Sequence, residues 1–150
     1  MTGFVTVGRV LFGADQIVAE WVVDRLPELL SVPDKMAALG VLDRSGSLIG
    51  GVIYHDQRGS DITVSIAASS PKWALPDTMA MLFQYPFGQL RLRRITCLVA
   101  ESNRRSARFC EGLGFVPEGR LREGAPDGSD MLIFGLLARD CKYLRRLAHE

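Results

Sequence analysis

Residues 61–100 read DITVSIAASS PKWALPDTMA MLFQYPFGQL RLRRITCLVA. Over residues 61–66 polar and apolar side chains alternate, which is typical of a half-buried strand, expected over 61–68. A helix is expected over 76–87, because Pro76 suits a first helical position and apolar residues then recur at helical spacing. Residues 94–99 have the pattern of another strand. This order of strand, helix and strand predicts two parallel strands with a right-handed connection.

The segment that follows predicts a second helix over 103–113. Asn103 is a favoured residue directly before a helix, and Gly114 is a favoured residue directly after one. Two more strands and a basic closing helix are then expected over 115–122, 131–137 and 139–147. Open sheets of this kind bind ligands at the carboxyl ends of their strands, beside helix N-termini.

The first sixty residues have weaker signals. A strand is expected over 4–12, followed by a helix from Ala14 and an irregular connection that contains Pro27 and Pro33. Two strands joined by a tight turn are expected over 41–42 and 48–54. The whole order predicts an α/β chain, with a mixed α+β sheet and helices on both faces, folded as one domain over residues 1–150.

The composition is that of one compact domain: 150 residues, 47% hydrophobic and 23% charged. This excludes a disordered chain, and no apolar run approaches a membrane span. No secretory signal is expected at the N-terminus. The cysteines Cys97, Cys110 and Cys141 include no C-x-x-C pair and no metal-ligand spacing. A disulfide scaffold and a zinc site are therefore disfavoured, and a cytoplasmic protein without a metal is expected.

Charge is distributed unevenly along the chain. Residues 1–90 contain 6 basic and 9 acidic side chains, and residues 91–150 contain 12 basic and 8 acidic ones. A basic C-terminal part suits an anionic ligand, either a nucleotide-like cofactor or a nucleic acid. The alternative is that the arginines lie on solvated helix faces.

Four short motifs occur at fixed spacing in the C-terminal half. They are Tyr85-Pro86-Phe87, Leu92-Arg93-Arg94-Ile95, the Asn-x-x-Ser-x-Arg run at 103–108 and the Leu-Gly-Phe-x-x-Glu-Gly-x-x-Arg run at 113–122. Residues 76–140 therefore resemble the C-terminal half of the GNAT superfamily of N-acetyltransferases, and most closely the branch that acetylates the N-termini of ribosomal proteins. The resemblance implies a GNAT-like acyl-CoA N-acyltransferase fold.

The resemblance also implies acetyl-CoA as co-substrate. A helix N-terminus would hold its diphosphate, and the backbone of a strand separated from its neighbour would pair with its pantetheine amides. The residues at the matching positions are Ile66, Ala67, Ala68, Lys72, Trp73, Ala74, Leu75, Pro76, Asn103 and Ser106. As an alternative, Asn103 only caps its helix and Ser106 lies on the surface. Residues 70–75 depart from the family pattern, because they contain neither of its two loop glycines.

Transfer of an acetyl group to an amine needs a proton acceptor and an acid for the leaving thiolate. The resemblance assigns the base to Asp61, with Ser65 on the same polar face of the strand, and the acid to Cys110, where the family has a tyrosine. The alternatives are a surface Asp61 beside a turn and a Cys110 that only packs. His55 lies next to a turn and has no partner evident in the sequence.

The predicted function is an N-acetyltransferase that moves an acetyl group from acetyl-CoA to a primary amine. The acceptor, a small molecule or a protein N-terminus, would be selected by residues 14–36 and 123–130. The main alternative is a catalytically degenerate GNAT fold that binds acyl-CoA or another protein. A third, a nucleic-acid-binding domain, lacks any recognisable motif. No membrane partner is expected, and a homodimer is left open.

Overall fold

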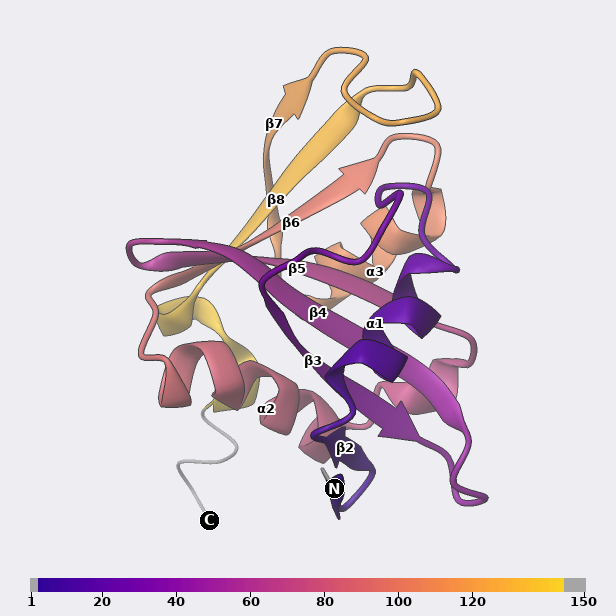
Figure 1. Cartoon of the computed structure of the whole chain (residues 1–150). Helices are drawn as coiled ribbons and strands as arrows, with labels where there is room; N and C mark the ends of the chain where they lie inside the picture. Colours follow the sequence, from indigo (N-terminus) through magenta and orange to yellow (C-terminus); the bar gives the residue numbers. More distant parts are fainter. Residues whose placement is uncertain (1–2, 145–150) are drawn as a thin grey trace.

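The computed structural model describes residues 3–144, which form three helices and one sheet of eight strands in the order β1-β2-β3-β4-β5-β6-β8-β7 (Figure 1). The elements are β1 (Val5–Val7), β2 (Val10–Phe12), α1 (Asp15–Val23), β3 (Met36–Leu42), β4 (Leu48–Arg58), β5 (Asp61–Ala68), α2 (Pro76–Gln84), β6 (Arg94–Ala100), α3 (Arg104–Leu113), β7 (Val116–Leu121) and β8 (Met131–Leu137). The predicted mixed α/β sheet is thus confirmed.

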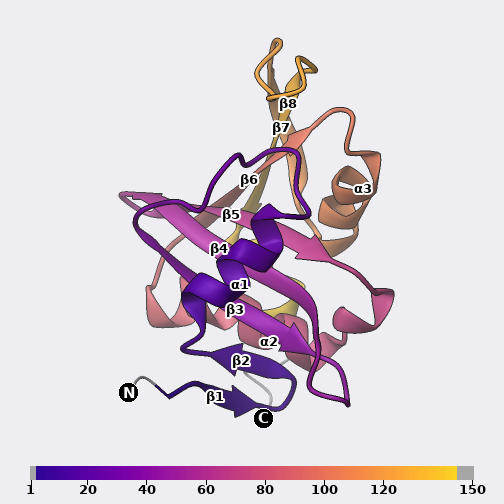
Figure 2. The ribbon, with the colours of Figure 1, turned by 45° about the vertical axis from the view of Figure 1, so that its right-hand side comes forward.

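The helices cover both faces of the sheet, as expected (Figures 1 and 2). Helix α1 packs Val18 and Val22 against a small cluster that includes Ile53 of β4. Helices α2 and α3 cover the other face, over the larger apolar core. The hydroxyl of Tyr54 ties β4 to α2, because it donates a buried hydrogen bond of 2.7 Å to the carbonyl oxygen of Leu82. Every residue of β5 therefore points either toward α1 or toward α2 and α3.

Strands β5 and β6 are the parallel pair, and they pair over only part of their length. The register runs from Asp61 opposite Arg94 to Val64 opposite Cys97. Beyond that point β5 continues against β4 as far as Ala68, while β6 continues against β8. The two strands therefore separate after their first four residues, and the sheet opens between them.

Helix α3 begins and ends where the sequence predicts. The side-chain oxygen of Asn103 accepts a hydrogen bond of 3.3 Å from the backbone N–H of Ser106. Gly114 ends the helix with a φ of 104°, a left-handed conformation that glycine adopts without strain. These two residues fix the direction in which α3 leaves the end of β6.

Four expectations need correction. Residues 4–12 form a hairpin, because Gly8 turns the chain with a φ of 57°. Strand β3 begins at Met36 and β4 extends to Arg58, so both are longer than predicted. The helix over 76–87 ends at Gln84 and continues as a wider turn over Tyr85–Gln89. A closing helix was expected over 139–147; its expected start instead lies in a short 3₁₀ turn over Ala138–Asp140, and its expected end lies outside the described residues.

Within residues 3–144, no helix is long and apolar enough to cross a membrane.

Candidate functional site

A groove with a volume of about 530 Å³ opens where β5 and β6 separate, on the side of α3. Its walls come from the end of β5, from the segment after β5, from α3 and from the end of α1. The lining residues are Arg25, Leu26, Ile66, Ala67, Ala68, Ser70, Pro71, Trp73, Ala74, Asn103, Arg105, Ser106, Arg108 and Phe109. Seven of the ten residues expected at a cofactor site are among them. Lys72, Leu75 and Pro76 are not, so the first turn of α2 does not form part of this groove.

The groove has a free strand edge along one wall. Residues 66–68 pair with β4 on one side only, because β6 has turned away after Cys97. Within residues 3–144, no strand pairs with this part of β5 on the β6 side. A backbone edge of this kind leaves N–H and C=O groups available to an extended ligand that carries amides.

Trp73 forms the inner wall of the groove. Its side chain is only 2% exposed, and its ring lies 5.0 Å from the ring of Phe109 of α3. It also covers Gly50 of β4, where an added Cβ atom would lie 2.5 Å from the indole Cε3. The glycine-free segment over 70–75 therefore buries a large aromatic side chain and contributes Trp73 to the floor of the groove.

The rim of the groove is basic. Arg105 and Arg108 lie on exposed positions of α3, and Arg25 approaches from the end of α1. The guanidinium of Arg25 stacks over the ring of Trp21 at 3.8 Å and donates to the carbonyl oxygen of the same residue. No carboxylate is among the lining residues. The groove is therefore suited to an anionic ligand.

A second, much smaller cavity of about 10 Å³ lies between the separating strands themselves. It brings together two of the residues predicted to be catalytic, Ser65 and Cys110, with Ser106 of the groove. Cys110 is buried, and its thiol lies 3.6 Å from that of Cys97. The contact with Cys110, together with burial, raises the pKa of Cys97 well above its usual range. The role of Cys110 as the acid stays a prediction.

Glu28 lines the same small cavity, and no pattern in the sequence indicates it. It lies in the connection between α1 and β3, and its Oε2 accepts a hydrogen bond of 2.7 Å from the backbone N–H of Ala100, the last residue of β6. The side-chain amide of Asn103 donates to both carboxylate oxygens, at 3.3 and 3.2 Å. Within residues 3–144, no cationic side chain forms an ion pair with Glu28. A negative charge thus lies at the opening, held only by neutral donors.

His55 is a further residue whose partners the sequence did not reveal. Its Nε2 lies 3.0 Å from the hydroxyl of Ser65, and its Nδ1 lies 3.0 Å from Oδ2 of Asp56. His55 and Ser65 are 7% and 8% exposed. His55 of β4 lies opposite Thr63 of β5. Ser65 is two residues further along β5, so it lies on the same face of the sheet as His55.

Asp61 lies away from these residues. It begins β5, at the paired end, four residues and therefore about 13 Å along the strand from Ser65. Its Oδ1 accepts a hydrogen bond of 2.9 Å from the hydroxyl of Thr96, and it forms ion pairs with Arg94 at 3.5 Å and Arg58 at 3.9 Å. The carboxylate lines a separate cavity of about 500 Å³ at that end of the sheet. Its role as a base stays a prediction, and the geometry does not bring it to the groove.

Among residues 3–144, no group of three His, Cys, Asp or Glu side chains is arranged to hold a metal ion.

Comparisons with known proteins give matches to solved structures only: no protein-family model matches the chain, and no curated protein matches it. Mutant forms of the spermidine/spermine N-acetyltransferase SpeG from Vibrio cholerae align with a TM-score of 0.60 at 26% identity, over 75% of this chain and 72% of that one. A dodecameric spermidine N-acetyltransferase from the same organism aligns with a TM-score of 0.58 at 25% identity, over 75% and 70%. A probable acetyltransferase aligns with a TM-score of 0.60 at 26% identity, over 71% and 63%.

The sheet that separates between its parallel strands, together with these matches, defines the class of protein as an N-acetyltransferase fold. The chain has the fold of the GNAT superfamily, as the motifs over 76–140 indicated. Its placement in the branch that acetylates ribosomal-protein N-termini is not confirmed by these matches.

Proposed function

We propose that this chain transfers an acetyl group from acetyl-CoA to a primary amine. The observation that carries the proposal is the separation of β5 and β6 after Val64 and Cys97, which opens onto a basic groove. The similarity in fold to acetyltransferases that act on spermidine and spermine supports it.

The residues of the groove fit acetyl-CoA in two respects. Arg25, Arg105 and Arg108 would hold the phosphates, a task for which the family pattern uses loop glycines that this chain lacks. The free edge at 66–68 would pair with the amides of the pantetheine arm. When bound, acetyl-CoA supplies an activated thioester as the acyl donor.

Glu28 supports an amine as the acceptor. Its carboxylate faces the opening from the connection between α1 and β3, and the donors that hold it, Ala100 and Asn103, are uncharged. An arriving ammonium group would provide the missing positive charge. Spermidine is the first acceptor to test, because the structural neighbours act on it, and a peptide with a free N-terminus is the second.

The alternative is a protein that binds acyl-CoA without transferring the acyl group. Two observations favour it: the segment over 70–75 lacks glycine, and a buried Cys110 stands where the family has a tyrosine. Turnover separates the two functions, because both require binding and only one releases free thiol.

The test has two stages. Calorimetry with acetyl-CoA is expected to show binding, and excess acetyl-CoA is expected to raise the melting temperature, because it binds only the folded chain. Release of free CoA thiol is then followed with spermidine and with a peptide amine. Binding without thiol release from any amine would favour the binding-only alternative. Absence of binding at millimolar acetyl-CoA would overturn both.

A further inference from the structure

We infer that Ser65 and His55 form a relay that takes a proton from the acceptor ammonium and delivers it to solvent beside Asp56. This inference rests on the proposed acetyl transfer and adds the path of the proton. It assigns to His55, which the sequence left without a partner, a part in the reaction.

The inner end of the relay lies at the opening of the sheet. Ser65 is the first residue of β5 beyond the segment paired with β6. Ser65 lines the small cavity between the strands together with Glu28, the carboxylate expected to attract the ammonium. An amine drawn to Glu28 is therefore brought next to the Ser65 hydroxyl, and Asp61 is not within its reach.

The hydrogen-bond partners determine the direction of transfer. The carboxylate of Asp56 has no hydrogen to donate, so Nδ1 of His55 donates to it. In a neutral imidazole the other nitrogen, Nε2, is then an acceptor, and the Ser65 hydroxyl donates to it. This is the tautomer that a relay directed from Ser65 to His55 requires, since Nε2 is free to take the proton.

The backbone conformation at Asp56 allows its carboxylate to contact Nδ1 of His55. Neighbouring residues of a strand normally point to opposite faces of the sheet. Here the pairing of β4 with β5 is interrupted between His55 and Arg58, and Asp56 has a φ of 52°, in the left-handed region. Such interruptions re-aim a side chain, and they are frequent beside functional sites. The result is that Asp56 turns back onto the ring of the residue that precedes it.

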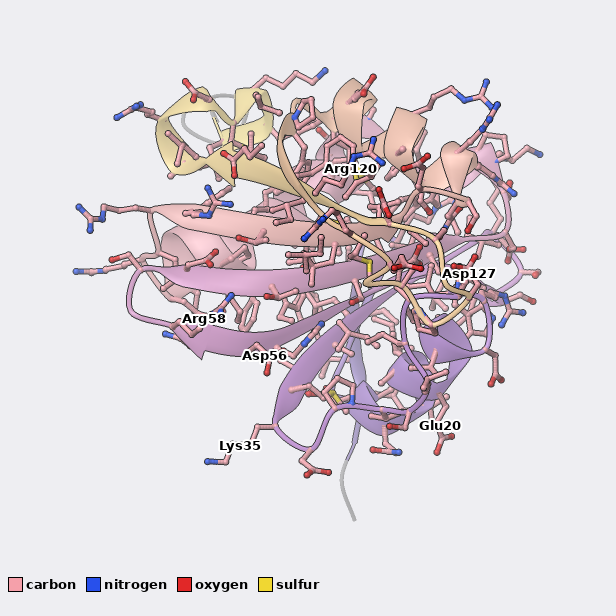
Figure 3. All side chains as sticks on the ribbon, turned by 90° about the horizontal axis from the view of Figure 1, so that it is seen from above. Glu20, Lys35, Asp56, Arg58, Arg120 and Asp127 are labelled. Carbon is pink, nitrogen blue, oxygen red and sulfur yellow. The ribbon has the colours of Figure 1, made fainter. Side chains whose placement is uncertain are left out.

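The outer end of the relay is open to solvent. His55 and Asp56 line a hollow of about 790 Å³, and the side chain of Asp56 is 72% exposed. Asp56 is the charged group in contact with His55, and the other charged or titratable residues that line the hollow are Asp34, Lys35, Tyr54 and Tyr85. From β5 it meets the uncharged Ser65. In Figure 3, Asp56 lies between Lys35 and Arg58 on one side of the molecule, away from Asp127.

The proton balance of the transfer is as follows. The ammonium gives one proton to the oxygen of Ser65 while the Ser65 hydroxyl gives its own to Nε2 of His55, and the resulting imidazolium releases its Nδ1 proton toward Asp56 and solvent. The neutral amine then forms the C–N bond, and the C–S bond of the thioester breaks. The second nitrogen proton goes to the departing thiolate, so the products are the amide, the free thiol and one proton in solution.

Four variants test the relay. His55→Gln and Ser65→Ala are each expected to lower kcat by roughly 10²-fold or more, the usual effect of losing a proton acceptor, with KM and acetyl-CoA affinity unchanged. Ser65→Thr keeps the hydroxyl and is expected to restore most of the rate. Thr63→Val is the matched control, because Thr63 is equally buried on the same face of β5 and forms no hydrogen bond with His55.

The pH dependence separates a relay from a structural role. The relay predicts that the wild-type rate falls at acidic pH, and His55→Gln is expected to abolish that fall. A structural role alone would lower the melting temperature and leave the shape of the profile intact.

A measurement without substrate tests the same geometry. Nitrogen NMR of the imidazole, assigned with His55→Gln, is expected to show the Nδ1–H tautomer in the wild type. The Nε2–H tautomer, or an unchanged pH profile in His55→Gln, would overturn the relay alone. A full loss of rate in Asp61→Asn with none in His55→Gln would place the base at Asp61 and also overturn it. A wild type that binds no acetyl-CoA would overturn the proposed function together with the relay.

Discussion

Asn103 shows how much a single side chain does at this site. Its amide oxygen caps α3 by accepting from the N–H of Ser106, and its amide nitrogen donates to Glu28. The same residue lines the groove. From the sequence, Asn103 could cap its helix or contact a cofactor. The structure shows the cap, and because Asn103 also lines the groove, its contact with a cofactor stays a prediction. Each hydrogen-bonding group of this side chain has its own partner.

Replacing Asn103 by Asp separates these contacts. The new carboxylate still caps the helix, but it cannot donate, and it places a second negative charge beside Glu28. We expect little loss of helix capping, and faster hydrogen exchange at the amide of Ala100, which Glu28 holds. Exchange is measured by NMR or mass spectrometry. Asn103→Ala is the comparison, since it is expected to lose the cap and about 1 kcal/mol of stability. Unchanged exchange in the Asp variant would mean that Glu28 is held independently of Asn103.

The three cysteines give a second prediction at this scale. Cys97, Cys110 and Cys141 are 4%, 2% and 1% exposed, and burial together with the Cys110 contact keeps the Cys97 thiol protonated. A buried, protonated thiol is a poor nucleophile. Titration with a disulfide reagent at pH 8 is therefore expected to detect almost no thiol in the folded chain and three equivalents in denaturant. Rapid reaction of one equivalent under native conditions would show that the core opens at one of these positions.

At the scale of elements, the C-terminal strands are held together by an ion pair that spans β8. The guanidinium of Arg94 in β6 donates to both carboxylate oxygens of Glu118 in β7, at 3.1 and 2.6 Å. The pair passes over Gly135 of β8, where an added Cβ atom would come within van der Waals overlap of the Glu118 carboxylate. A glycine in the middle strand is therefore what lets two non-adjacent strands meet through their side chains.

This ion pair predicts a pH-dependent contribution to stability. The hydrogen bond and charge of Arg94 hold the pKa of Glu118 below its usual range in the folded chain. The folded state therefore favours the ionised form, so the stabilisation is present above the unfolded pKa of about 4.3 and is lost as pH falls through the lowered value. Glu118→Gln is expected to lower the free energy of unfolding by up to about 1 kcal/mol at pH 7, as befits a partly exposed pair.

Urea unfolding at pH 7 and pH 3 measures this difference, which is expected to shrink at the lower pH. Glu111→Gln on the exposed side of α3 is the control and is expected to change stability little at either pH. An equal loss at both values would mean that Glu118 acts through packing rather than charge.

Some of these strands and contacts could be predicted from the sequence and others could not. Strand β5 is predicted at its observed bounds, because polar and apolar residues alternate over 61–66. The hairpin at the N-terminus was missed, because Val5, Val7 and Val10 continue one apolar pattern through the turn at Gly8. Seven of the fourteen residues that line the groove are residues that the family resemblance assigns to a cofactor site. Glu28 could not be found, because its partner Ala100 lies 72 residues away and the contact depends on the path of an irregular connection.

In the whole molecule, arginines from distant parts of the chain come together at the groove. The basic C-terminal part contributes Arg105 and Arg108 to one rim of the groove, and Arg25 comes from the opposite end of the chain. Some arginines outside the groove form ion pairs, among them Arg120, which contacts Glu101 and Asp130 beside the β7–β8 hairpin (Figure 3). A chain of net charge +1 therefore places three guanidinium groups and no carboxylate along the groove.

Acetyl-CoA binding is accordingly expected to weaken as salt increases, since exposed charges are screened over about 8–10 Å at 0.1–0.15 M. Arg105→Gln and Arg108→Gln are each expected to weaken binding by roughly two- to fivefold and to reduce its salt dependence, as the loss of one exposed ion pair of up to about 1 kcal/mol would do. Arg104→Gln on the same turn of α3 is the control, because Arg104 does not line the groove. Calorimetry at several salt concentrations makes the comparison. Equal effects of all three variants would point to a general field rather than to a defined site.

The hydrogen bonds of Glu28 have a consequence for the order of events at the site. Asn103 is a wall of the groove and at the same time a donor to the connection between α1 and β3. A ligand in the groove that alters how Asn103 is held also alters how firmly that connection is fixed, and a ligand bound beneath the connection acts back on the groove. Thermodynamic reciprocity makes the two effects equal in size. Under the proposed function, a first substrate that alters how Asn103 is held would change the affinity for the second by the same factor in either order of binding.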